Sequence, residues 1–102
     1  MKRIKHRYLA LQLDSAVSPA PSELLGAIWG ALTKLYGEYG ASHTNLALID
    51  YNMEEKTATV RTALSTLDMV RTSLAMITSI ANRETAIHVM VVSGTKKALN
   101  KK

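Results

Sequence analysis

The end of the chain, VVSGTKKALNKK, holds the densest group of residues that could bind a charged ligand. The apolar residues before Gly94 read as the end of a strand, and Thr95 could cap a short helix that follows. Lys96 and Lys97 would then lie in the first turn of that helix, where cations face the positive end of the helix dipole. Because a helix N-terminus itself binds anions, the segment predicts a phosphate-binding site.

The positive charge of the protein is concentrated at its two ends. The net charge is +5, and all eight acids lie between residues 8 and 84 together with only five of the thirteen cations. The other eight cations are expected to contact phosphate groups without reading bases: Lys2, Arg3, Lys5, Arg7, Lys96, Lys97, Lys101 and Lys102. Arg61, in the middle of a predicted strand, is a further candidate for a phosphate or partner contact.

No catalytic or metal-binding pattern is legible. His6, His43 and His88 lack the spacing of metal ligands, and the chain has no cysteine. Gly37 and Gly40 match the GxxG of a KH domain, but Glu38 lies between them and a strand follows, which favours the end of a helix. We therefore expect no catalytic residue, no metal site and no bound cofactor.

Length and composition predict one intracellular domain. The 102 residues suffice for one core, so residues 1–102 are expected to form a single domain. The absence of cysteine fits a reducing compartment. No apolar run approaches the ~20 residues of a membrane span, and the start does not read as a signal peptide. We expect a cytoplasmic protein without a membrane partner.

Apolar periodicity predicts six main elements. The first helix is opened by Pro21 or Ser22 and closed near Gly40, and its apolar stripe places Trp29 in the core. The second is opened by a capping box at Ser65 and Asp68 and stopped near Asn82. The expected elements are a strand at 6–14, a helix at 23–39, strands at 43–52 and 56–64, a helix at 65–82 and a strand at 85–93.

This order predicts an α+β protein with the ferredoxin-like, RRM-like βαββαβ arrangement. We expect a four-stranded antiparallel sheet, two helices on one of its faces, and a short basic C-terminal helix. The first and third strands should be central, and the last should flank the first. Because the start of the first strand would then lie beside the end of the last, the two basic termini should meet at one pole.

Four segments resemble one family in the same order along the chain. HRYLALQL, LYGEYGAS, TATVRTAL and VMVVSGTKKA are similar to the archaeal ribonuclease P protein component 2 family, related to the eukaryotic Pop-five subunit. The resemblance implies a subunit of the ribonucleoprotein that removes the 5′ leader of precursor tRNA. It implies that catalysis belongs to the RNA subunit and its magnesium ions. It also implies a TIM-barrel-like protein component 3 as partner, beside other ribonuclease P proteins, with precursor tRNA contacted indirectly.

The face of the sheet away from the helices is predicted to bind protein rather than stacked bases. The third strand, KTATVRTAL, has no aromatic residue on which bases could stack. The exposed apolar residues predict a partner surface, and we expect a heterodimer or a homodimer of heterodimers. Its candidate residues are Tyr8, Met90 and Val92 on the open face and Ile49 and Tyr51 on the edge strand.

Two other classes share this topology. One alternative is a protein-interaction or small-molecule regulatory domain that binds no RNA. A regulatory domain of the ACT type would need a glycine in the first loop so that a ligand can approach the backbone, and SAVSPAPS has none. An acylphosphatase-like enzyme would need an arginine-bearing phosphate loop directly after the first strand. The nearest arginine, Arg7, is at the beginning of that strand instead.

Overall fold

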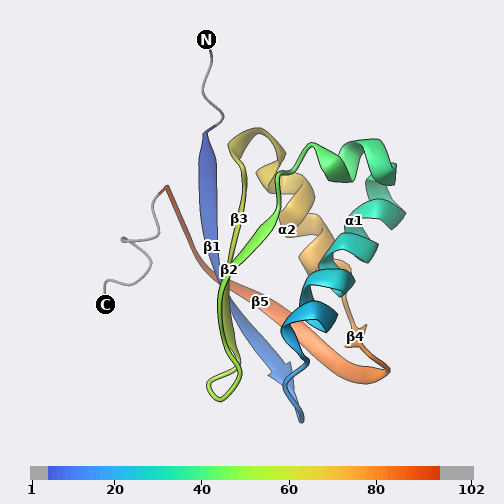
Figure 1. The fold of residues 1–102 in the computed structure, drawn as a ribbon, viewed down its shortest axis with the longest axis vertical. Coiled ribbons are helices and arrows are strands. Elements are labelled where there is room, and N and C mark those ends of the chain that lie inside the picture. The colour runs from blue at the N-terminus through green and yellow to red at the C-terminus, as the bar shows by residue number, and fades with distance from the viewer. Residues whose placement is uncertain (1–4, 95–102) are drawn as a thin grey trace.

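The chain folds into one antiparallel β-sheet with two helices packed on one of its faces (Figure 1). The computed structural model describes residues 5–94. In chain order the elements are β1 (His6–Ser15), α1 (Pro21–Ser42), β2 (Ala47–Asn52), β3 (Thr57–Ala63), the 3-10 turn η1 (Leu64–Thr66), α2 (Leu67–Met76), β4 (Ser79–Ile80) and β5 (Arg83–Ser93). The predicted α+β class is confirmed.

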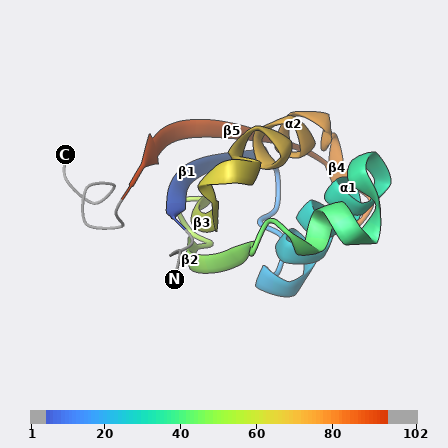
Figure 2. The ribbon, with the colours of Figure 1, turned by 90° about the horizontal axis from the view of Figure 1, so that it is seen from above.

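The strands are ordered β2-β3-β1-β5-β4, and every neighbouring pair is antiparallel. The prediction that the first and third strands are central and that the last flanks the first is confirmed. The sheet differs from the predicted one by β4, a two-residue strand that pairs with the start of β5. Seen from above, the sheet curls partly around the helices (Figure 2).

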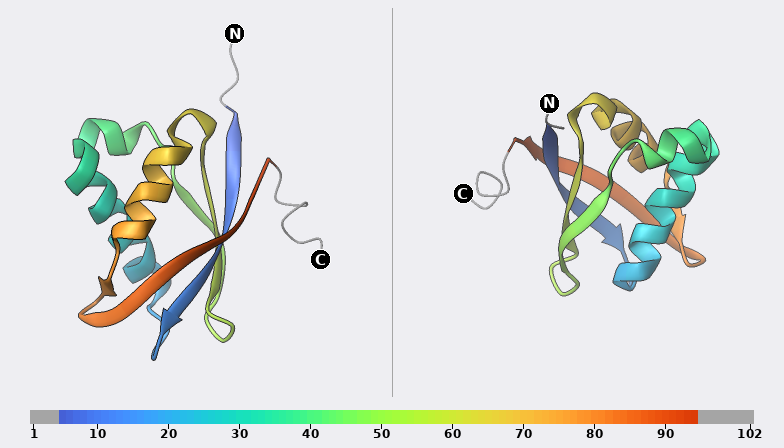
Figure 3. Two further views of the ribbon diagram at one scale, coloured as in Figure 1. Left: turned by 180° about the vertical axis from the view of Figure 1, so that it is seen from behind. Right: turned by 45° about the horizontal axis from the view of Figure 1, so that its top comes forward.

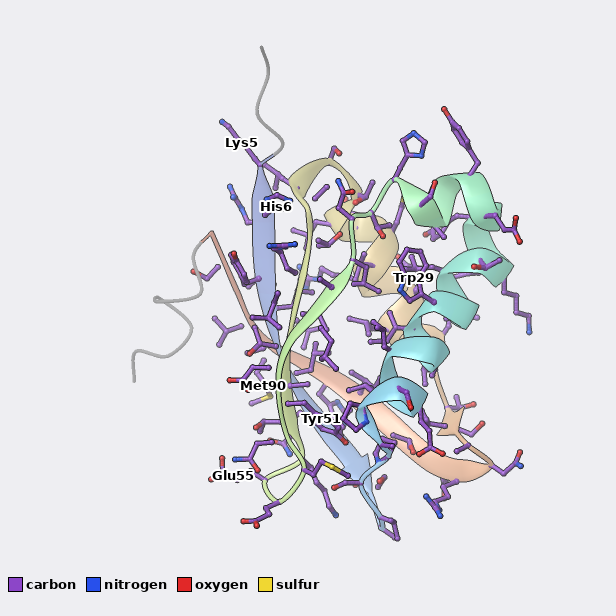
Figure 4. All side chains as sticks on the ribbon, viewed as in Figure 1. Lys5, His6, Trp29, Tyr51, Glu55 and Met90 are labelled. Carbon is purple, nitrogen blue, oxygen red and sulfur yellow. The ribbon has the colours of Figure 1, made fainter. Side chains whose placement is uncertain are left out.

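The core lies between the helices and the inward face of the sheet. Leu9, Leu11 and Leu13 alternate along β1 and are at most 2% exposed, as a strand with one buried face requires. They pack with a stripe on α1 and a shorter one on α2, which contribute Leu24, Ile28, Leu32, Val70 and Leu74. Trp29 is half-buried against this cluster, so its predicted core position is confirmed (Figure 4).

Helix α1 begins as predicted but is broken before its C-terminal end. Pro21 is its first residue, and the carboxylate of Glu23 accepts the Ala20 backbone N–H at 2.8 Å. The predicted closure near Gly40 is correct to within two residues, but the break before it was not predicted. The helix breaks at Gly37, whose φ of 76° and ψ of 170° are not helical, and then continues to Ser42 with His43 as the C-cap.

Helix α2 is shorter than predicted at both ends. Ser65 and Asp68 do not form a capping box: Thr66 is the N-cap, and no side chain bonds the first turn. The helix ends at Met76, not near Asn82, because the chain becomes extended at Ile77. Ile77 and Ile80 are buried nonetheless, Ile77 directly after the helix and Ile80 in β4.

One prediction on the end of the chain lies outside the described residues. The short basic helix after Gly94 falls in residues 95–102. Within residues 5–94, neither helix is long and apolar enough to pass through a bilayer.

Candidate nucleic-acid interface

The start of β1 and the end of β5 lie side by side at one pole of the sheet, as predicted (Figure 3). Tyr8 pairs with Ser93 in the antiparallel ladder. One residue further out, a Cβ on Gly94 would lie 3.4 Å from Nη1 of Arg7, so the guanidinium covers Gly94. We call this end of the sheet the terminal pole; it is where the described chain enters at Lys5 and leaves at Gly94.

Lys5 and Arg7 are the two described cations of the terminal pole. Lys5 is exposed, and its carbonyl accepts the Leu64 backbone N–H at 2.7 Å, which ties the start of the described chain to η1. Arg7 is half-buried and donates from Nη1 to the His6 carbonyl at 2.9 Å. The other six predicted phosphate contacts, Lys2, Arg3, Lys96, Lys97, Lys101 and Lys102, lie outside the described residues.

Arg61 is not on the same face as Arg7. It pairs with Tyr8 on the open face, whereas Arg7 pairs with Thr62, whose side chain is buried under the helices. The Nε atom of Arg61 is buried and has no hydrogen-bond partner among the described residues. An unsatisfied charged donor is costly, and a phosphate or carboxylate oxygen would supply the missing acceptor only after a shift of the side chain that uncovers Nε. Arg61 therefore stays a candidate contact, separate from the terminal pole.

Charge on the open face changes sign away from the terminal pole. A hollow of about 390 Å³ near the β2–β3 turn is lined in part by Asp50 and Glu55, beside Gln12, Asn52 and Met90. Figure 4 shows Glu55 at one end of the sheet and Lys5 at the other. Carboxylates repel phosphate, so the electrostatics favour RNA at the terminal pole and disfavour it at the β2–β3 end.

The predicted exposure of the candidate partner residues on β5 is confirmed for Met90 and wrong for Val92. Met90 is 63% exposed, and Tyr8 is half-buried on the open face. The pairing of β1 with β5 shifts between Ala10 and Leu11, so Met90 is the extra residue of a bulge. Strand alternation therefore reverses beyond Met90. Val92 packs against the core, and the outward position that was predicted for Val92 is taken by Val91, which is 49% exposed.

The edge-strand candidates are also changed by a bulge. The register of β2 with β3 shifts between Leu48 and Asp50, so Ile49 is the extra residue and is half-buried. Tyr51 pairs with buried Ala58 and packs against the core, and its hydroxyl donates to the Pro19 carbonyl at 2.7 Å. Burial raises the pKa of its phenol. The prediction that Tyr51 is free surface is wrong.

One pair of side chains at the end of α1 was missed by the sequence reasoning. Tyr39 continues the apolar spacing of the first helix, yet it is 80% exposed and packs its ring on His43, with centroids 4.3 Å apart. The break at Gly37 turns the last part of α1 so that the stripe no longer faces the core. The only signal in the sequence was the GxxG itself, which read as a helix end.

Comparison with known proteins gives one consistent result. The model of the Rpp14/Pop5 family matches residues 7–102. "Ribonuclease P protein component 2" of Pyrococcus abyssi is 31% identical over 100 residues, covering 98% of this chain and 85% of that protein. The protein of the same name from Methanosarcina barkeri is 29% identical over 100 residues, covering 98% and 73%.

The fold is similar to that of a chain in a solved structure, "Cryo-EM structure of yeast Ribonuclease MRP". The TM-score is 0.74 over 93% of this chain and 78% of that chain, at 14% sequence identity. At that identity the likeness concerns the fold alone.

Proposed function

The chain belongs to the Rpp14/Pop5 family and is a protein subunit of ribonuclease P, and we propose that it serves there by binding the phosphate backbone of the RNA and a partner protein. It is not the catalytic part of that enzyme. Cleavage of the 5′ leader of precursor tRNA, with its magnesium ions, would belong to the RNA subunit. The protein's own contribution is to neutralise phosphate and to hold the particle together.

The observation that carries this proposal is the meeting of the chain ends at the terminal pole. The pairing of Tyr8 with Ser93 and the contact between Arg7 and Gly94 bring both ends of the described chain together. Eight of the thirteen cations lie in residues 1–7 and 96–102, and neither segment contains an acid. Two basic segments far apart in sequence therefore start from one place, and their charges add.

RNA binding of this kind positions the protein without reading sequence. Phosphate contacts made by lysine and arginine fix orientation, and each one makes the affinity depend on salt. The carboxylates of Asp50 and Glu55 keep phosphate away from the other end of the open face. Arg61, with its unpartnered buried Nε, is proposed as a single contact on the open face, to a phosphate or to a carboxylate of the partner.

The protein partner is proposed to be the TIM-barrel-like component 3, docking on the open face. Met90 and Val91 are adjacent, exposed and apolar, and Tyr8 lies on the same face. Such a patch with a polar rim marks a protein contact more often than a nucleic-acid one. A heterodimer, or a symmetric pair of heterodimers, in the cytoplasm is the assembly that we propose.

The test is to purify the tagged protein from its host and to sequence the RNA and identify the proteins that accompany it. One abundant structured RNA together with other ribonuclease P proteins is the expected result. A variant with Met90 and Val91 changed to serine should keep the RNA-binding pole and lose the component 3 partner from the purified material. Recovery of the protein with no RNA would instead favour a protein-interaction domain.

A further inference from the structure

The last part of α1 is held in a fixed orientation by two glycines. Gly37, with its positive φ, allows the break that redirects the helix. At Gly40 a Cβ would lie 2.9 Å from Cβ of Tyr36 and 3.5 Å from Cε of Met69, so a side chain would push this turn away from its neighbours. The turn from residue 38 to residue 42 is therefore seated closely on the rest of the helix and on α2.

Tyr39 and His43 form a supported aromatic pair on that turn. Their ring centroids are 4.3 Å apart, with an angle of 50° between the planes. Nδ1 of His43 lies 2.7 Å from the Tyr39 carbonyl oxygen. Because a carbonyl oxygen can only accept a hydrogen bond, Nδ1 must carry the ring proton, and Nε2 takes no part in this bond. Ser42 donates to the same carbonyl at 2.8 Å. The pair is thus fixed before any ligand arrives, while the ring of Tyr39 stays 80% exposed.

The surroundings of the pair are polar. A hollow of about 310 Å³ beside His43 is lined by Ser42, His43, Asn45, Ala63 and Ser65, none of them acidic. Ser65 belongs to η1, whose Leu64 N–H is bound by the Lys5 carbonyl, so η1 lies between the hollow and the terminal pole. The nearest acid in sequence, Glu38, is exposed on the same turn of the helix.

We propose that Tyr39 and His43 are a stacking platform for one unpaired base of the RNA that the terminal pole binds. Sequence-tolerant recognition of single-stranded RNA combines a positive surface with an exposed aromatic ring on which a base can stack. The hydroxyls of Ser42 and Ser65 and the amide of Asn45 suit a base edge or a ribose hydroxyl. The hollow on the His43 side offers hydroxyls and an amide, as RNA recognition requires, although Leu35 and Tyr36, in the preceding turn of the helix, are also partly exposed.

This inference rests on the proposed function and deepens it. Strand β3 lacks the aromatic residues on which related folds stack bases, and the platform would supply that function from the end of α1 instead. Stacking would then come from the end of α1 and phosphate binding from the terminal pole, which lie on different sides of the molecule (Figure 1). The base contact adds affinity that does not depend on counterion release.

The experiment measures binding of the in vitro transcribed ribonuclease P RNA of the source organism to four forms of the chain over a series of salt concentrations. The wild type is compared with Tyr39→Ala, Tyr39→Leu and Tyr39→Trp. Base stacking is worth about 1–3 kcal/mol, which corresponds to a loss of about 5- to 150-fold for alanine. Leucine keeps apolar area without a ring and should lose nearly as much, whereas tryptophan should bind at least as tightly as the wild type.

The slope of log K against log salt separates this platform from the phosphate contacts. It should be the same for all four proteins, because no charge is changed. Their urea midpoints should also agree, since the ring is exposed, and a shared fold makes the binding data comparable.

Equal affinity of wild type, alanine and leucine variants would overturn the inference while leaving the proposed function intact. So would unchanged RNA affinity with weakened co-assembly of the protein partner, because the ring would then belong to a protein contact. A wild-type protein that does not bind the RNA at all would instead count against the proposed function, and the inference of a stacking platform would then be rejected as well.

Discussion

Replacing Thr62 by valine tests how the end of α1 and the start of η1 are fixed to the sheet. Thr62 is fully buried, and its hydroxyl donates to the Thr44 carbonyl at 3.0 Å and lies 3.2 Å from Oγ1 of Thr66. Valine has nearly the same shape, so the loss is that of hydrogen bonds and not of packing. Thr66 still donates to the Ala63 carbonyl, and the Thr44 carbonyl still accepts the Ala63 N–H, so no partner is orphaned.

The expected cost follows from that count. One hydrogen bond, from the Thr62 hydroxyl to the Thr44 carbonyl, is lost, because the single hydroxyl hydrogen of Thr66 is donated to Ala63. With no group left unsatisfied, the free energy of unfolding should fall by about 0.5–1.5 kcal/mol. Thr44→Val should cost more, about 2–4 kcal/mol. Its Oγ1 donates to the Ala41 carbonyl and accepts the buried Leu46 N–H, which would lose this acceptor.

Urea unfolding followed by circular dichroism measures both values, and Thr59→Val on the outward side of β3 is the matched control. The control should change the unfolding free energy by less than about 0.5 kcal/mol. The melting temperature should fall by about 4–8 °C for each kcal/mol of stability removed. If Thr62→Val and Thr44→Val were both as stable as the control, the buried hydroxyls would not hold this pole, and the reasoning would be wrong.

Three further predictions concern the hydrogen bond of Tyr51, the β4–β5 turn and the basic C-terminal segment. Tyr51→Phe should destabilise the fold by about 1–3 kcal/mol, because the Pro19 carbonyl loses its donor. Burial, followed by the charge of Glu23, raises the pKa of Tyr51, so the wild-type fold should lose stability as pH rises above about 10, the unfolded value. Urea midpoints measured over a range of pH should show a smaller decline for Tyr51→Phe than for the wild type. An equal decline in both proteins would contradict the assignment of the pH dependence to Tyr51. Ala81 has a φ of 53°, and Ala81→Gly should stabilise the protein by up to about 1.6 kcal/mol. The change relieves about 1–2 kcal/mol of backbone strain and costs about 0.4–1 kcal/mol through the greater entropy of the unfolded chain. A lower melting temperature would argue against strain at that turn. Changing Lys96 and Lys97 to glutamine should weaken RNA binding with little effect on stability, and should reduce the slope of log K against log salt by about 0.7–0.9 for each phosphate that is no longer neutralised. Unchanged affinity and slope would place both lysines outside the RNA interface.

The elements and the order of the strands followed from the sequence because the apolar period is unambiguous there. Leu9, Leu11 and Leu13 can be buried together only on one face of a strand, and the stripe that contains Leu24, Ile28 and Leu32 only on one face of a helix. The meeting of the termini followed from the topology alone. Neither prediction depends on the exact register of the strands or on the positions of single side chains.

The outward-facing residues were harder to predict, because one extra residue reverses every side chain beyond it. Met90 and Ile49 are apolar residues in apolar strands, and nothing in their type marks them as bulges. The errors at Val92 and Tyr51 both come from counting through such a residue. In the same way, Gly37 left the apolar stripe of α1 intact in sequence while it turned Tyr39 away from the core.

The unpartnered Nε of Arg61 illustrates what a sequence cannot state. The sequence places an arginine on the open face, but only the packing shows that part of its guanidinium is buried without an acceptor. That feature distinguishes a solvated arginine from one that awaits a partner. Arg61→Lys, which keeps the charge but has no Nε, and Arg61→Gln are the variants that would separate charge from geometry.

The most direct test of the central claim is reconstitution of ribonuclease P activity with this one chain left out. Precursor tRNA cleavage is measured at modest magnesium with the RNA and the other ribonuclease P proteins, with and without the chain, and with the chain alone. We predict that adding the chain raises the rate, because neutralised phosphate repulsion matters most at low magnesium, and that the chain alone cleaves nothing. Equal rates with and without the chain, or cleavage by the purified chain in the absence of RNA, would contradict the account.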